Sequence, residues 1–153
     1  SHPGWRMISL ARRPFVSRII IAEDDDILAE VVRDILIDAG HAVGILERGE
    51  DAMVAIRLKR PDLVILDCNL PGISGVQVLQ KMRIEADLWD TPVLMLTART
   101  SHSDEKVAMF AGADEYMRKP FDPDQLIVTV NRLIASAEER RARMNPPRMV
   151  RSI

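Results

Sequence analysis

The residues of this sequence best suited to chemistry are a few acids, one hydroxyl and one lysine. Glu23 and Asp24 begin an acidic run, Asp67 and Thr97 each follow a short apolar stretch, and Lys119 follows the mixed segment 114–118. Three carboxylates gathered in a small space would repel one another, at a cost of about 4 kcal/mol per pair at ~4 Å and an effective dielectric near 20. A hard dication together with Lys119 would balance these charges. Mg²⁺ prefers oxygen ligands and commonly joins carboxylates to a phosphoryl group, so the set indicates Mg²⁺-dependent phosphoryl chemistry.

The elements that must position these residues follow an α/β pattern. Apolar runs rich in β-branched residues alternate with segments of helical period. Four of the five runs are almost entirely apolar, as expected of a parallel sheet covered by helices on both faces. The predicted strands are residues 18–22, 41–46, 62–66, 92–96 and 114–118. The predicted helices are residues 27–39, which stop at Gly40, then 50–59, 74–86, 103–111 and 123–143.

Each candidate residue follows the carboxyl end of a predicted strand. In an open parallel sheet these ends share one edge, and ligands bind in the crevice beyond it. We therefore expect the acids, Thr97 and Lys119 to converge there. A dinucleotide site is excluded, because acids follow the first strand where such a site needs a G-x-G-x-x-G turn to receive the pyrophosphate.

Taken in order, these residues resemble the receiver domain of bacterial two-component response regulators. The likeness covers residues 18–137 and implies a doubly wound, five-stranded (βα)5 sheet of flavodoxin-like order 2-1-3-4-5. Its features are the pair Glu23-Asp24, the turn Asp67-x-Asn69-Leu70-Pro71-Gly72-x-x-Gly75, Thr97-Ala98, Gly112-Ala113-Asp114-x-Tyr116, and Lys119-Pro120-Phe121.

The resemblance implies a role for each residue of the acidic pocket. Asp67 would be the phosphoacceptor, taking a phosphoryl group from a histidine kinase or a histidine phosphotransfer protein. Asp24, Asp67 and the backbone carbonyl of Asn69 would hold Mg²⁺, and Glu23 would act through water. Lys119 would contact the phosphoryl oxygens, and its bond to Pro120 resembles the cis peptide of the family.

The resemblance also implies roles in the conformational switch and in the lifetime of the acyl phosphate. Thr97 would donate its hydroxyl to the phosphoryl group while Tyr116 moves inward. Asn69 and Arg99 stand where the family tunes hydrolysis of the acyl phosphate. Cys68 is expected to be packed and inert. Asp25 and Asp26 suit the start of a helix and receive no catalytic role.

The output surface departs from one pattern of the family. Receivers that dimerise to drive winged-helix transcription factors use paired charges where this chain has Glu105, Gln125 and Thr129, in place of a base, an acid and a base. We therefore expect a downstream protein partner on the face made by helix 103–111, strand 114–118 and helix 123–143. The sequence favours a stand-alone receiver, and it leaves undecided whether the protein forms a homodimer.

Two alternative functions remain. A Mg²⁺-dependent phosphohydrolase with an aspartyl nucleophile often carries an acid two residues later, where this chain has Asn69. The chain could also be the receiver half of a truncated DNA-binding transcription regulator. The receiver interpretation predicts no enzyme for an external substrate, only a protein that catalyses its own phosphorylation and dephosphorylation.

Composition narrows the class. The chain of 153 residues, 47% of them apolar, suits one domain, with residues 1–17 as an extension and 138–153 as a basic helical tail. Residues 1–6 resemble a cloning remnant. The net charge is −2, but the two ends of the chain are basic and the middle is acidic. Because the acidic middle is the domain itself, we expect it not to bind nucleic acid. The sequence shows no membrane span, secretory signal or zinc-ligand spacing, and predicts a cytoplasmic protein.

Overall fold

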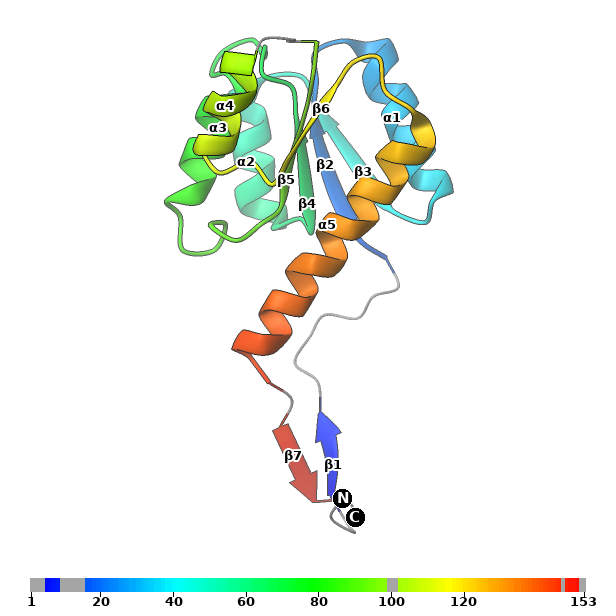
Figure 1. Ribbon diagram of the computed structural model, residues 1–153, viewed down its shortest axis with the longest axis vertical. Coiled ribbons are helices and arrows are strands. Elements are labelled where there is room, and N and C mark those ends of the chain that lie inside the picture. The colour runs from blue at the N-terminus through cyan, green and yellow to red at the C-terminus, as the bar shows by residue number, and fades with distance from the viewer. Residues whose placement is uncertain (1–4, 9–15, 99–101, 147, 152–153) are drawn as a thin grey trace.

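The fold is a central sheet flanked by helices, with a small separate pair of strands (Figure 1). The computed structural model describes residues 5–8, 16–98, 102–146 and 148–151. The strands are β1 (Trp5–Ile8), β2 (Arg18–Ala22), β3 (Ala42–Leu46), β4 (Leu63–Leu66), β5 (Val93–Thr97), β6 (Glu115–Arg118) and β7 (Arg148–Arg151). The helices are α1 (Asp26–Asp38), α2 (Gly49–Lys59), α3 (Gly75–Arg83), α4 (His102–Phe110) and α5 (Pro123–Met144).

Five parallel strands pair in the order β3-β2-β4-β5-β6. Without the separate β1, this is the predicted order 2-1-3-4-5, and the doubly wound α/β class is confirmed. The central strands β4 and β5 are buried along their whole length, which explains their almost entirely apolar sequences.

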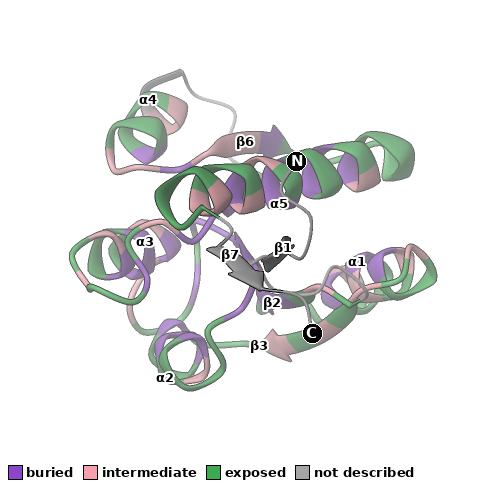
Figure 2. Ribbon diagram, turned by 90° about the horizontal axis from the view of Figure 1, so that it is seen from below, coloured by how far each residue is buried: buried purple, intermediate pink, exposed green. Residues whose placement is uncertain are grey.

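Helices cover both faces of the sheet (Figure 2). On one face α1 and α5 pack Val32, Leu36, Leu126 and Val130 against the strands. On the other face α2, α3 and α4 pack Ile56, Leu79 and Ala108 into a second apolar cluster with the strands. The two cores hold the strands in a fixed register, so the carboxyl ends of β2, β4, β5 and β6 meet at one edge.

Local signals fix where several helices begin. Asp25 caps α1 by accepting hydrogen bonds from the amides of Ile27 and Leu28, which supports a structural role for this acid. Ser74 and Gln77 form a reciprocal capping box at the start of α3.

Helix α3 is shorter than the sequence pattern predicts, because it ends at Arg83 rather than at residue 86. The following loop folds back around the guanidinium group of Arg83. That group donates hydrogen bonds to the carbonyls of Trp89 and Thr91 at 3.1 and 2.7 Å. A tertiary contact thus ends this helix.

The terminal strands were not predicted. The sequence indicated extensions at 1–17 and 138–153, whereas β1 pairs with β7 in an antiparallel register from Trp5 opposite Arg151 to Ile8 opposite Arg148. This pair lies beyond the end of α5, apart from the main sheet (Figure 1). Within the described ranges, no helix is both long and apolar enough to cross a membrane.

Candidate functional site

Lys119 joins the two buried acids of the site. Its Nζ donates a short hydrogen bond to Glu23 Oε1 and lies 3.2 Å from Asp67 Oδ2. The three side chains come from loops after β6, β2 and β4. Glu23 and Asp67 are only 4% and 7% exposed, so these charges interact with little screening by water.

Backbone hydrogen bonds hold the three loops together. The Asp67 amide donates to the Ala22 carbonyl at 3.0 Å, and the Lys119 amide donates to the Thr97 carbonyl at 3.0 Å. Glu23, Asp67 and Lys119 are each the first residue beyond a strand, and Thr97 is the last residue of β5. The sheet provides a rigid frame for the site.

The fold changes the acid–base properties of two of these groups. Burial raises the pKa of Glu23 to about 7, although the hydrogen bond from Lys119 lowers it. Burial acts to lower the pKa of Lys119, but the hydrogen bond to Glu23 and the charge of Asp67 outweigh it and raise that pKa. Lys119 is therefore a cation at neutral pH.

Asp24 completes an acidic cluster with Glu23 and Asp67. Carboxylate oxygens of the three residues all lie within 4.8 Å of one another. Two of the residues are buried and Asp24 is exposed, so the cluster opens to solvent on one side. This donor set, oxygen-rich, anionic and open to water, fits Mg²⁺, which keeps several waters when bound.

The predicted switch residues lie in the neighbouring strands β5 and β6. Thr97 is completely buried at the end of β5, and Tyr116 is half-buried in β6, where it packs against the core under α4. The Lys119–Pro120 peptide is cis, as the resemblance implied. Arg99, expected to tune hydrolysis, lies outside the described residues.

The neighbours of Asp67 lie against it or in the core. The Asn69 amide donates to Asp67 Oδ1 at 3.1 Å, and Cys68 is 6% exposed within the core. One contact near the site was missed by sequence reasoning. Glu50 of α2 accepts a hydrogen bond from the Ile73 amide at 3.1 Å, across 23 positions of sequence. Only the glycine of the Pro71-Gly72 turn hinted that something approaches this loop closely.

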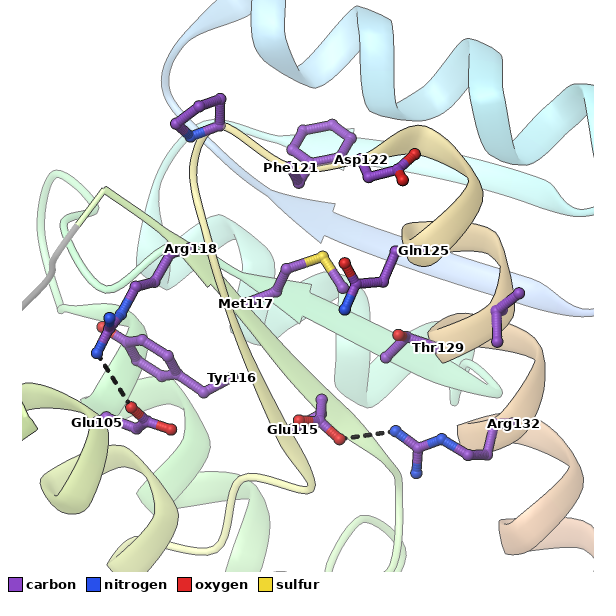
Figure 3. A pocket seen from close by; sticks show the side chains of 12 residues that line it. Glu105, Glu115, Tyr116, Met117, Arg118, Phe121, Asp122, Gln125, Thr129 and Arg132 are labelled. Carbon is purple, nitrogen blue, oxygen red and sulfur yellow. Dashed lines mark hydrogen bonds and ion pairs between the residues drawn. The ribbon is translucent and has the colours of Figure 1, made fainter.

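The face expected to form the output surface contains a hollow of about 680 Å³ between β6 and α5 (Figure 3). Two ion pairs line it: Arg132 of α5 with Glu115 of β6 at 2.6 Å, and Arg118 of β6 with Glu105 of α4 at 3.3 Å. Gln125 of α5 also lines the hollow.

The sequence profile described as "Response regulator receiver domain" matches residues 19–131, which include the whole site. The chain belongs to this family. The alternative of a phosphohydrolase of another class receives no support from the match, and the receiver interpretation of the fold is confirmed.

Curated relatives of this receiver are transcription regulators. It is 36% identical over 127 residues to the DNA-binding response regulator MtrA of Mycolicibacterium smegmatis, which covers 83% of this chain and 54% of the relative. It is 33% identical over 121 residues to the phosphate regulon transcriptional regulatory protein PhoB of Rhizobium meliloti, with coverage of 79% and 53%. The chain thus spans about half the length of the curated relatives it matches.

Solved structures of similar fold are nearly as short as the receiver itself. A response regulator from Chloroflexus aurantiacus superposes with a TM-score of 0.75 at 35% identity, covering 78% of this chain and 98% of the other. The chemotaxis response regulator CheY4 of Vibrio cholerae superposes with a TM-score of 0.73 at 29% identity, covering 77% and 98%.

Proposed function

We propose that this receiver accepts a phosphoryl group on Asp67 and uses it to switch a protein-interaction surface. The observation that carries the proposal is the Lys119 bridge to Glu23 and Asp67 beside an exposed third acid, Asp24. A buried carboxylate held by a cation, at an acidic edge open to solvent, suits the acceptance of a phosphoryl group from a large protein donor.

In the proposed transfer, an Asp67 carboxylate oxygen attacks the phosphorus of a phosphohistidine. The phosphorus–nitrogen bond breaks, and its electron pair stays on the imidazole, which leaves as a neutral ring when its other nitrogen is protonated. Lys119 keeps its ammonium group near Asp67 and pairs with negative charge on the incoming phosphoryl group. Hydrolysis by water would return Asp67 to a carboxylate.

Asp24, Asp67 and the Asn69 carbonyl are the groups we propose to hold Mg²⁺, with Glu23 acting through water. The ion, when bound, supplies positive charge that offsets the phosphoryl oxygens. The approach of the three carboxylates to within 4.8 Å of one another supports this assignment, because a bound cation would offset the negative charge that they gather.

A direct test uses acetyl phosphate, Mg²⁺ and intact-protein mass spectrometry. The wild type should gain one phosphoryl group that is labile in base, and Asp67→Ala should gain none. Asp24→Ala should fold normally but bind Mg²⁺ more weakly in calorimetric titration, because one of about three protein ligands is lost. Normal labelling of Asp67→Ala would overturn the assignment.

A control with a generic phosphatase substrate separates the receiver from an enzyme. We expect no turnover of p-nitrophenyl phosphate beyond the background rate, because Asn69 supplies no acid to protonate a leaving group. Sustained turnover that Asp67→Ala abolishes would favour the phosphohydrolase alternative.

A second candidate function is the receiver part of a DNA-binding regulator. It is favoured by MtrA and PhoB, which are named as DNA-binding or transcriptional regulators and are about twice as long as the matched segment. The stand-alone receiver competes with it. Reading the complete gene decides between them, since a reading frame that continues into a DNA-binding domain would exclude the stand-alone protein.

A further inference from the structure

The loop that follows Asp67 is tied to the first turn of α2. The Gly49 amide donates to the Pro71 carbonyl at 3.1 Å, and the Ile73 amide donates to Glu50 Oε1 at 3.1 Å. Two successive residues of α2 therefore hold the far end of the loop through one backbone bond and one side-chain bond.

The contact between Glu50 and this loop depends on a missing side chain. Gly72 has a φ of +78°, and a Cβ added there would lie 1.9 Å from Glu50 Oε2. The carboxylate of Glu50 thus occupies the space that a side chain at position 72 would need. The positive φ favours glycine at this position, and any side chain there would require the flexible end of Glu50 to move.

The near end of the same loop belongs to the phosphorylation site. The Asn69 amide is bonded to Asp67 Oδ1, and the Gly75 amide donates to the Cys68 carbonyl at 3.1 Å. Between these anchors, the two bonds to α2 hold the backbone at Pro71 and Ile73, and the buried side chain of Leu70 holds it from the core side. That path sets the direction of the Asn69 carbonyl, which lies four residues before Ile73.

We propose that Glu50 is a positioning residue for the phosphorylation site. Its carboxylate fixes the turn at Gly72 and Ile73, and through it the Asn69 carbonyl and the Asp67 carboxylate that would hold Mg²⁺. The inference rests on the proposed function of Asp67. Groups behind the ligands of a metal site commonly control its affinity, because they orient those ligands.

The competing explanation is that Glu50 only adds negative charge near the start of a helix. Its ion pair with Arg48 is long, at 3.6 Å, and half-exposed, so that pair contributes little. Asp51 lies in the same first turn and is exposed. Asp51→Ala therefore removes the same charge from the same helix end, and serves as the matched control.

The experiment compares Glu50→Ala, Glu50→Gln and Asp51→Ala with the wild type. In metal-free protein, amide exchange at Ile73 should accelerate in Glu50→Ala alone, because glutamine keeps an acceptor oxygen. Calorimetry should show Mg²⁺ binding weakened by about tenfold in Glu50→Ala, the lower end of the usual loss of an outer partner. Glu50→Gln should recover most of that affinity, and Asp51→Ala should bind as the wild type does.

Gly72→Ala supplies a second, independent test. Its methyl group should push the Glu50 carboxylate away from the Ile73 amide, so Mg²⁺ binding should weaken as it does in Glu50→Ala. The double variant should bind hardly more weakly than either single variant, because both changes break the same contact.

The outcomes separate this inference from the proposed function. If the wild type accepts phosphate on Asp67 and Glu50→Ala matches Asp51→Ala in Mg²⁺ affinity and in Ile73 exchange, Glu50 has no positioning role. If the wild type accepts no phosphate, the proposed function fails, while Ile73 exchange and Mg²⁺ binding still test the role of Glu50.

Discussion

Thr97 is the residue through which a phosphoryl group on Asp67 would be sensed. It is completely buried, and its carbonyl is already bonded to the Lys119 amide. Moving a two-state equilibrium from 1:99 to 99:1 takes about 5.5 kcal/mol, and hydrogen bonds to charged groups contribute roughly 1.5–3 kcal/mol each. Thr97 and Lys119 together can thus supply most of the required difference.

We therefore predict that Thr97→Ala still accepts phosphate but responds weakly to it. In the wild type, amide chemical shifts on phosphorylation should cluster at residues 97–125. In Thr97→Ala they should remain local to Asp67, and Thr97→Ser, which keeps the hydroxyl, should behave as the wild type. A full response in Thr97→Ala would show that the hydroxyl is not the coupling group.

Glu23 makes the stability of the metal-free protein depend on pH. Burial raises its pKa from 4.5 to about 7, so the folded state holds a proton that the unfolded state has released. The stability contributed by this proton is complete below about 4.5 and is lost as the pH rises through about 7.

Glu23→Gln should remove this dependence, because the amide is uncharged at every pH. We predict that its melting temperature rises relative to the wild type between about pH 4.5 and pH 7 in the presence of a chelator. The same variant should bind Mg²⁺ more weakly, since the pocket loses one negative charge. A difference in melting temperature between the variant and the wild type that stays constant across this pH range would contradict the prediction.

Arg83 connects α3 to the turn before β6. Besides its bonds to the loop, it donates to the Gly112 carbonyl at 2.9 Å and pairs with Asp114 at 3.0 Å. Burial lowers the pKa of Arg83, although the charge of Asp114 opposes this, and the guanidinium stays charged. One side chain thus holds the end of α4 and the start of β6.

Arg83→Ala should therefore be strongly destabilising, by about 2–4 kcal/mol in urea unfolding, because buried carbonyls and Asp114 lose a charged partner. Arg57→Ala is the matched control. Arg57 pairs with Glu85 at 2.6 Å, but its side chain is 50% exposed, so its loss should cost much less stability than the loss of Arg83. Equal losses for the two variants would contradict this ranking.

The elements and the site were predictable from the sequence to different degrees. The apolar runs at β2, β4 and β5 and the acids after them identify the sheet edge, because burial on both faces leaves a clear pattern. The Arg83 contacts, the Glu50 contact and the β1–β7 pair were not predictable. Each joins residues distant in sequence, and neither a lone charged side chain nor a four-residue strand carries a periodic signal.

At the scale of the whole molecule, the charges of the β6–α5 face are satisfied within the chain. Arg118 and Arg132 pair with Glu105 and Glu115, so a dimer through this face would have to separate those pairs. The pattern of the receivers that dimerise there has a base in place of Glu105 and an acid in place of exposed Gln125. Light scattering should therefore give the molar mass of a monomer for the wild type, with or without a phosphoryl analogue.

A variant that restores two of the missing charges, Glu105→Lys with Gln125→Glu, should gain the ability to dimerise. The new lysine frees Arg118 from its partner and presents a base to the new acid on a second copy, which satisfies a two-fold interface in which each pair occurs twice. Thr129 is left unchanged because it is buried, and a charge there would be costly. Light scattering should show a dimer only with the analogue bound, since in the proposed switch Thr97 and Tyr116 rearrange behind this face first. A wild type that dimerises with the analogue, or a double variant that accepts phosphate yet stays monomeric, would contradict the assignment of dimerisation to these charges.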